Sequence, residues 1–173
     1  MSRLPFAQRL PLQCPGLEFV PEQDADTAFV CELYASTRWQ EMAQTAWDDD
    51  AKRAFLYKQF ELQRDHYRKN YVGAEFLVVR QHGQPIGRIY LFASAREIRL
   101  MDVALVDVKR GQGLGRAMIE GLMKLAREDA ADITLHVEPN NPALQLYRRL
   151  GFSLIEDRGV YHFLGWKPGT VPA

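Results

Sequence analysis

Arg110-Gly111-Gln112-Gly113-Leu114-Gly115-Arg116 is a glycine-rich segment of this 173-residue chain, between a predicted strand at residues 98–106 and a predicted helix at residues 114–128. Backbone amides at the start of a helix, together with the helix dipole, attract anions. Glycines let phosphate oxygens approach the backbone closely, and the two arginines add positive charge. The segment therefore predicts a site for a pyrophosphate group.

Two other phosphate-binding patterns fit this segment poorly. A dinucleotide fingerprint reads G-x-G-x-x-G after the first strand, whereas this loop reads G-x-G-x-G and follows about four predicted strands. A nucleotide P-loop ends in Gly-Lys-Ser/Thr, which the chain does not contain. The alternative that remains is structural, namely that the glycines only form a tight turn from strand to helix.

Hydrophobic periodicity predicts the element order β-α-α-β-β-β-α-β-α-β-β. The predicted strands span residues 17–20, 75–80, 85–92, 98–106, 132–137, 152–156 and 160–166, and the helices span about 24–37, 51–69, 114–128 and 142–150. Residues 1–15 contain three prolines and are predicted to be an irregular leader, with residues 16–173 as a single domain.

Composition excludes several classes of protein. Hydrophobic residues make up 47% of the chain and charged residues 25%, which is typical of a globular domain rather than a disordered one. The 22 basic and 22 acidic residues leave no net charge, which argues against a nucleic-acid or anionic-membrane partner. No apolar run approaches the ~18 residues of a membrane span. Cys14 and Cys31 form no metal-ligand pattern, so a cytoplasmic protein without a metal is predicted.

Two motifs in this order resemble the GNAT superfamily of acetyl-CoA-dependent N-acetyltransferases. The first is the signature Q/R-x-x-G-x-G/A, matched by Arg110, Gly113 and Gly115 after the apolar run Val103-Ala104-Leu105-Val106. The second is an asparagine followed by a short helix ending in Tyr-x-x-x-Gly-Phe, which resembles residues 141–152.

The resemblance implies a mixed α/β (α+β) single domain with helices on both faces of a mainly antiparallel sheet. In this family, strands four and five are parallel and splay apart, and the pantetheine arm of acetyl-CoA inserts between them. By resemblance, Leu105 and Val106 would bond pantetheine through their backbones, and Asn141 and Tyr147 would approach the thiol end. The pyrophosphate would be held by Arg110, Gly111, Gln112, Gly113, Leu114, Gly115 and Arg116.

Acetyl transfer to an amine requires a base, because an alkyl amine with a pKa near ~10 is mostly protonated at neutral pH. Asp102 is the first candidate, since an acid is unexpected among apolar strand residues unless it is paired or functional. The alternative is an ion pair with Arg88 or Arg99. Glu138 is the second candidate, with a solvated strand end as its alternative. His136 is the third, with a half-buried, hydrogen-bonded structural histidine as its alternative.

The leaving thiolate should receive a proton, and the phenol of Tyr147 is the predicted donor. The alternative for Tyr147 is core packing on an apolar helix stripe, which is compatible with an exposed hydroxyl. A backbone amide near Leu105 would stabilise the oxyanion of the tetrahedral intermediate.

The acceptor is predicted to lie over the helices that precede the hairpin. Acids and aromatic rings that could attract a cationic amine concentrate there, at Arg38, Trp39, Glu41, Trp47, Asp48, Asp49 and Asp50. The alternative is that the three aspartates only stabilise a helix N-terminus.

The sequence thus predicts an acetyltransferase that uses direct attack by a primary amine. The alternative is an inactive CoA-binding sensor of the same fold. Expected acceptors are an amine-bearing small molecule, a peptide or protein N-terminus, or a lysine. The sequence does not decide among these acceptors, whether the acyl group is acetyl or longer, or whether the protein forms a homodimer.

Overall fold

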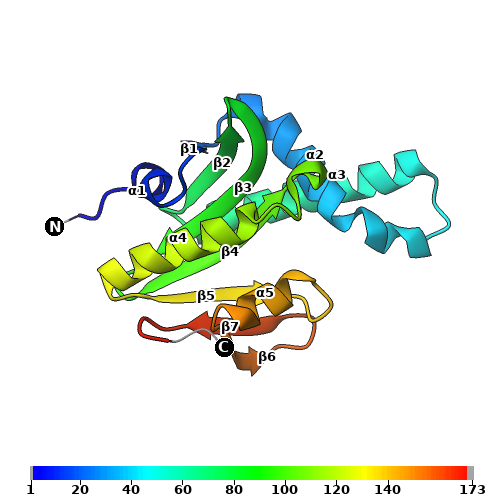
Figure 1. The fold of residues 1–173 in the computed structure, drawn as a ribbon. Helices are drawn as coiled ribbons and strands as arrows, with labels where there is room; N and C mark the ends of the chain where they lie inside the picture. Colours follow the sequence, from blue (N-terminus) through cyan, green and yellow to red (C-terminus); the bar gives the residue numbers. More distant parts are fainter. Residues whose placement is uncertain (1, 171–173) are drawn as a thin grey trace.

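The computed structural model describes residues 2–170 and contains a seven-stranded sheet with the order β1-β2-β3-β4-β5-β7-β6 (Figure 1). The strands are β1 (Leu17–Pro21), β2 (Glu75–Gln81), β3 (Gln84–Ala93), β4 (Glu97–Leu105), β5 (Asp132–Val137), β6 (Ser153–Asp157) and β7 (His162–Trp166). The helices are α1 (Phe6–Gln13), α2 (Thr27–Arg38), α3 (Asp49–Asn70), α4 (Leu114–Asp129) and α5 (Ala143–Arg149), with short 3-10 turns η1 (Asp24–Asp26), η2 (Trp39–Gln44) and η3 (Asp107–Lys109). Among the strands of residues 2–170, only β4 and β5 pair in parallel, which confirms the predicted mixed sheet.

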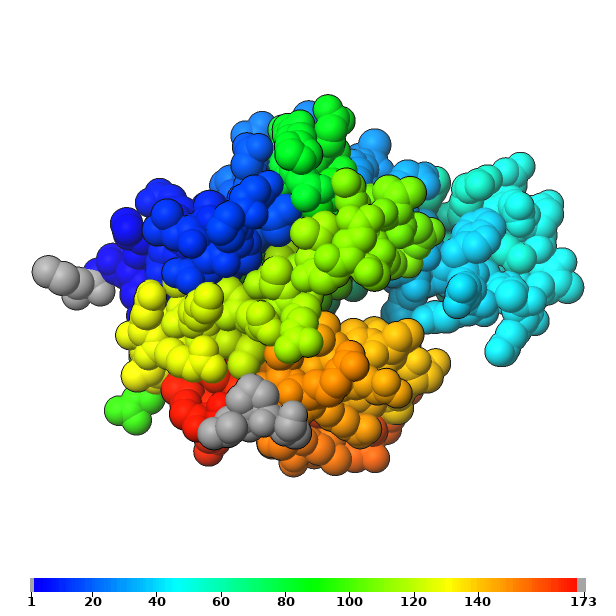
Figure 2. Space-filling model, viewed as in Figure 1, coloured from blue at the N-terminus to red at the C-terminus, as the bar shows by residue number. Residues whose placement is uncertain are grey.

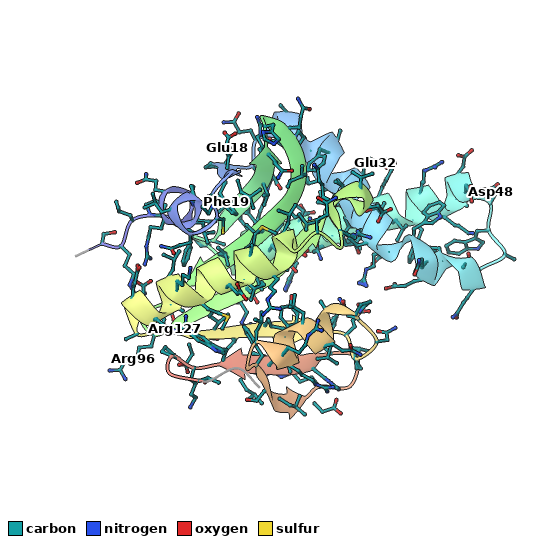
Figure 3. The ribbon with its side chains drawn as sticks, in the orientation of Figure 1. Glu18, Phe19, Glu32, Asp48, Arg96 and Arg127 are labelled. Carbon is teal, nitrogen blue, oxygen red and sulfur yellow. The ribbon has the colours of Figure 1, made fainter. Side chains whose placement is uncertain are left out.

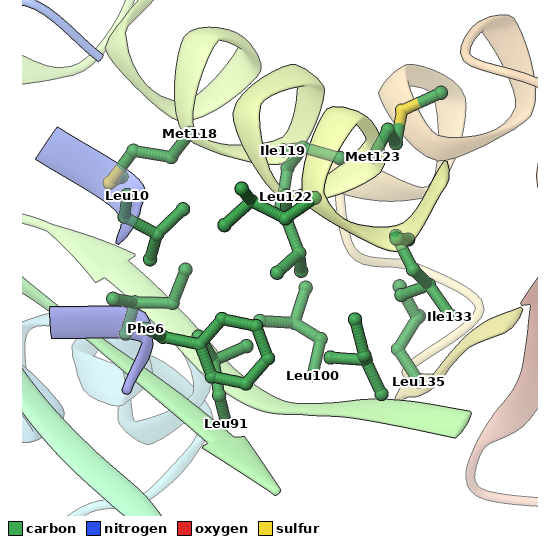
Figure 4. Close-up of a cluster of buried hydrophobic side chains, with 14 of the residues drawn as sticks. Phe6, Leu10, Leu91, Leu100, Met118, Ile119, Leu122, Met123, Ile133 and Leu135 are labelled. Carbon is green, nitrogen blue, oxygen red and sulfur yellow. The ribbon is translucent and has the colours of Figure 1, made fainter. Parts of the chain in front are cut away.

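Helices cover both faces of the sheet, as Figure 1 shows. On one face α1 and α4 pack over the sheet, and their apolar side chains meet those of β3, β4 and β5 (Figure 4). Phe6, Leu10, Ile119 and Leu122 belong to this main core. On the other face a smaller core joins α2 and α3 to Val78 of β2. The alternation of side chains along the strands supplies apolar residues to both cores.

The irregular leader predicted for residues 1–15 is wrong, because residues 6–13 form α1. Phe6 and Leu10 lie one turn apart and are both buried in the main core. The Glu75 carboxylate accepts hydrogen bonds from the amides of Phe6 and Ala7, at 2.8 and 3.0 Å. These contacts outweigh the helix-breaking tendency of Pro11, which lies inside the helix.

A β-bulge interrupts β4 at Met101. Tyr90 pairs with Asp102 and Leu91 with Leu100, so Met101 has no partner on β3. Leu100 faces the main core, and if Met101 paired regularly with β3, Asp102, two residues after Leu100, would share that face. The bulge therefore turns Asp102 toward the face covered by α2 and α3.

The parallel pairing of β4 with β5 is short. It comprises four residue pairs and ends at Leu100 and Leu135, although both strands continue beyond them. Figure 1 shows the two strands diverging from this junction, with α4 connecting them. The predicted splay of strands four and five is thus present and leaves an opening within the sheet.

Candidate active site

A cleft lies where β4 and β5 diverge. It encloses about 360 Å³ of space, including the solvent at its mouth. Its walls are Leu100, Met101, Asp102 and Val103 of β4, Leu135, His136 and Val137 of β5, and Asn141 and Tyr147 at α5. Figure 2 shows the surface hollowed between the start of α4, α5 and the region around η2. Four sequence-predicted candidates, Asp102, His136, Asn141 and Tyr147, therefore share one cleft.

The glycine-rich loop precedes α4 and has the geometry of an anion cradle. Gly111 and Gly113 have φ angles of +72° and +80°, a region that favours glycine. No side chain caps α4 and no acid occurs in its first turn. Within residues 2–170, the amides of residues 111–116 have no hydrogen-bond acceptor. These free amides at a helix start fit a pyrophosphate group.

Two polar side chains of the loop hold the loop itself. Arg110 donates through Nε to the Leu105 carbonyl at 2.9 Å and pairs with Asp107. Gln112 donates to the Val108 carbonyl at 2.9 Å. The loop therefore offers a phosphate mainly its backbone amides.

The edge of β4 that turns away from β3 lies at Val103 and Leu105, where the Leu105 amide is free within residues 2–170 and the Leu105 carbonyl accepts from Arg110. The Val106 amide donates to the Ile86 carbonyl at 2.8 Å on β3. Since backbone bonds alternate along an antiparallel pair, the residues at positions 103 and 105 turn their backbone groups away from β3. Of the two residues expected to bond pantetheine, Leu105 is thus placed for it, whereas the Val106 amide is already engaged.

Asp102 forms the ion pair with Arg88 that the sequence left open as its alternative role. The Arg88 side chain is only 2% exposed, and that of Asp102 is 21% exposed. The pair uses Oδ2 of Asp102, while Oδ1 makes no hydrogen bond with residues 2–170. Asp102 is therefore paired on one side and borders the cleft on the other.

Tyr147 combines core packing with a cleft-facing hydroxyl. Its ring is 6% exposed and contacts Phe152. The hydroxyl makes no hydrogen bond within residues 2–170 and is not one of the fully enclosed polar atoms, so it opens to the cleft. Burial, and to a lesser degree the negative charge of Asp102, raise the pKa of this phenol above its usual value. Tyr147 consequently keeps its proton at neutral pH.

The other two base candidates are held by arginines. Glu138 accepts a hydrogen bond from Arg38 through Oε1 at 2.7 Å and, unlike Asp102, does not line the cleft. His136 stacks on Phe163, and its Nε2 lies 2.7 Å from Nη1 of Arg158. A guanidinium only donates, so Nε2 is the acceptor in a neutral ring. Partial burial and the nearby arginines lower the pKa of His136, in agreement with that state.

The acidic and aromatic cluster predicted to receive the acceptor is mostly structural. Asp48 caps α3 by accepting from the Ala51 amide at 2.8 Å, at the outer end of the α2–α3 arm (Figure 3). Lys52 and Arg53 of α3 lie over the Trp39 ring, and Trp47 contacts Phe55. Of the residues in this cluster, only Arg38 contacts a residue next to the cleft, because it forms an ion pair with Glu138.

Asn141 has a structural role besides lining the cleft. Its side-chain oxygen accepts from the Ala143 amide at 2.9 Å, which caps the start of α5 and thereby sets the position of Tyr147. Five cleft residues were not predicted as site residues, namely Leu100, Met101, Val103, Leu135 and Val137. Met101 and Val103 lie at or beyond the bulge. Their exposure to the cleft depends on the bulge, for which the sequence carries no signal.

Two negative findings apply to residues 2–170. No helix there has the length and apolar character required to span a bilayer. No group of three or more potential metal-ligating side chains gathers there.

Comparison with known proteins gives the same picture. Residues 22–152, well over half of the chain, match the acetyltransferase (GNAT) family. A mycothiol acetyltransferase of Corynebacterium kroppenstedtii is 35% identical over 83 residues, which is 47% of this chain and 20% of that protein. One of Corynebacterium glutamicum is 27% identical over 130 residues, covering 74% of this chain and 37% of that protein. The chain thus spans roughly a fifth to a third of the length of these curated relatives.

Two solved structures share the fold at low sequence identity. The PaiA N-acetyltransferase of Thermoplasma acidophilum, solved with coenzyme A, has a TM-score of 0.64 at 16% identity, covering 87% of this chain and 98% of that one. The ribosomal-protein-S18-alanine N-acetyltransferase of Escherichia coli has a TM-score of 0.58 at 16% identity, covering 90% and 96%. With the family match, the splayed strands and the glycine loop, these findings show that the chain belongs to the acetyltransferase (GNAT) family.

Proposed function

We propose that this chain transfers an acetyl group from acetyl-CoA to a primary amine by direct attack of the amine. The strongest support for this proposal is that Asp102 and Tyr147 line the same cleft, at the opening between β4 and β5. Acetyl-CoA, the cosubstrate of GNAT acetyltransferases, supplies the thioester.

Backbone groups account for cosubstrate binding in this proposal. The free amides of residues 111–116 hold the pyrophosphate, and the edge of β4 that turns away from β3, at Val103 and Leu105, bonds the pantetheine arm. The thioester then lies deep in the cleft, near Tyr147. The Leu105 amide, or that of Val103, donates to the oxyanion of the tetrahedral intermediate.

Two side chains move the protons. Asp102 accepts a proton from the incoming ammonium through its unpaired Oδ1, directly or through water, which leaves a neutral nucleophile. The amine nitrogen then bonds to the acetyl carbon, and the carbon–sulfur bond breaks. The nitrogen releases its remaining excess proton to water, and water returns a proton to the Tyr147 phenolate that forms in the next step. Tyr147 donates its proton to the departing thiolate, because its raised pKa keeps the phenol protonated until then.

The test is amine-dependent release of CoA thiol. The panel contains small primary amines, amino sugars, peptides with a free N-terminus, a lysine peptide and the desacetyl form of mycothiol, since the curated relatives are named for mycothiol. Thiol release that depends on both substrates, with acetylated amine detected by mass spectrometry, supports the proposal. Tight CoA binding without turnover of any amine would favour a sensor role instead.

A further inference from the structure

Arg88 is a fully charged side chain at the centre of the domain. It lies on β3, its side chain is 2% exposed, and its guanidinium lies over the rings of Tyr90 and Tyr34, at 4.7 and 5.9 Å from their centroids. Burial favours the neutral form, but Asp102, Tyr90 and Tyr67 outweigh this effect and raise the pKa of Arg88. The guanidinium therefore stays charged and has no role as a proton carrier.

Burying such a charge is costly unless its partners are well placed. Nη2 of Arg88 bonds the Asp102 carboxylate and also Oε1 of Gln63 on α3, the latter at 3.1 Å. Nη1 lies 3.4 Å from the Tyr90 hydroxyl. The two Nη atoms thus hold the planar guanidinium, whereas the buried Nε of Arg88 has no hydrogen-bond partner within residues 2–170. A flexible ammonium in its place would not be held in one plane.

The contacts continue away from the cleft. The Tyr90 hydroxyl donates to the carboxylate of Glu22, whose side chain is 5% exposed. Gln63 belongs to α3 and Tyr90 to β3, so the guanidinium is held by two elements that do not line the cleft. Asp102 is the single member of this network that does.

The network explains the orientation of Asp102. The Met101 bulge turns the carboxylate toward Arg88, and the ion pair takes Oδ2. Asp102 lines the cleft, and its Oδ1 has no hydrogen-bond partner in residues 2–170. A carboxylate held in this way presents one oxygen to the cleft in a fixed position, which is what proton transfer in a small cleft requires.

We propose that Arg88, supported by Gln63 and Tyr90, is a positioning residue that fixes the Asp102 carboxylate for its reaction with the acceptor amine. This role rests on the proposed acetyltransferase function. Arg88 itself does not touch substrate in this proposal; it acts through Asp102.

The first experiment separates positioning from structural support. Arg88→Lys keeps the charge and loses the planar fork, so kcat with the acceptor amine is expected to fall about tenfold to a hundredfold. The KM for acetyl-CoA and the calorimetric Kd for CoA are expected to stay unchanged. Arg99→Lys is the matched control, because Arg99 lies on the neighbouring strand and pairs with Glu97 rather than Asp102. An unchanged kcat in Arg88→Lys, with only a lower Tm, would overturn the inference.

The second experiment is a double-mutant cycle in kcat between Arg88→Met and Asp102→Asn. If Arg88 acts through Asp102, the double variant is expected to be as slow as Asp102→Asn alone. Effects that multiply would show that Arg88 acts independently and would also overturn the inference. Should Arg88→Met fail to fold, Gln63→Leu replaces it in the cycle, since it removes one support of Arg88 and leaves the ion pair in place.

Wild-type turnover separates failure of this inference from failure of the proposed function. If no amine supports thiol release by the wild-type protein, the proposed function fails and this role fails with it. If the wild type turns over and Arg88→Lys is equally fast, only the role of Arg88 is rejected.

Discussion

Asp102 and Glu138, the two carboxylates nearest the proposed reaction, differ in how each is held. Asp102 lines the cleft and pairs with a buried arginine, and one of its oxygens has no partner within residues 2–170. Glu138 pairs with the partly exposed Arg38 and does not line the cleft. This difference favours Asp102 as the base. Glu138 instead forms an ion pair that connects the end of β5 to α2.

Substitution of Asp102 tests the base directly. Asp102→Asn keeps the size of the side chain but not its ability to accept a proton, so kcat/KM is expected to fall by about 10² or more at neutral pH. The deficit should shrink as the pH rises toward the pKa of the amine, because more amine then arrives neutral. The measurement is a pH–rate profile beside the melting temperature.

Glu138→Gln is the comparison for that profile. It is expected to leave the shape of the profile unchanged, because Glu138 does not line the cleft. A normal profile with a lowered melting point for Asp102→Asn, together with a collapsed acid limb for Glu138→Gln, would transfer the base to Glu138.

Tyr147→Phe removes the proposed proton donor and leaves the ring in the core. We expect kcat to fall about tenfold to a hundredfold, with unchanged CoA affinity by calorimetry. In the wild type, the raised pKa of Tyr147 should keep the phenol active as a donor up to at least its ordinary pKa near ~10. If Tyr147→Phe turns over as fast as the wild type under conditions where chemistry limits the rate, Tyr147 has a packing role only.

At the scale of elements, the loop before α4 depends on its backbone. Gly113 has a φ of +80° and open space where a Cβ would be, so Gly113→Val strains the loop without clashing with the protein. We expect CoA binding to be lost in calorimetry and the far-UV CD spectrum to be kept. Gly83→Val is the matched control, since Gly83 has a φ of +75°, equally open space and a place in the β2–β3 turn. Undiminished CoA affinity in folded Gly113→Val protein would remove the loop from the site.

Helix α1 depends on a carboxylate from another element. Glu75→Gln keeps the shape of the side chain but removes its charge. It also replaces one of the two oxygens that accept hydrogen bonds from the Phe6 and Ala7 amides. The free energy of unfolding is expected to drop by about 1 kcal/mol in urea titration. Glu18→Gln on β1, where the side chain points to solvent (Figure 3), should leave it unchanged. Equal stability of both variants would argue against this cap.

Elements could be predicted from the sequence where the signal is local. Strand β5 has the predicted bounds, and α4 differs by a single residue at its end. Helix α1 was missed because its cap comes from Glu75, 68 and 69 residues away, and its core contacts come from the sheet. The Met101 bulge and the pairing of Asp102 with Arg88 also depend on strand register, which no local pattern specifies. The candidate residues were therefore predictable, whereas among their partners only Arg88 was named, as one of two alternatives for Asp102.

At the scale of the whole molecule, the cleft divides the sheet into two parts that four residue pairs and α4 hold together. A ligand that bonds both the loop and β4 should stabilise the folded state by mass action. At a CoA concentration of about 100 times Kd, the gain is about 2.7 kcal/mol, visible as a higher Tm. Gly113→Val should lose this shift. A Tm that CoA does not raise in the wild type would show that the cleft does not bind it.

The parting of β4 and β5 after Leu100 and Leu135 also bears on how this protein can evolve. Deleting the extra residue at Met101 and pairing both strands to their ends would give a more regular sheet without a cleft. Selection for stability alone would favour such changes, whereas selection for activity would oppose them. Thermostable variants that keep full activity are therefore expected to carry their substitutions away from this junction, and those altered within it to be stable but slow.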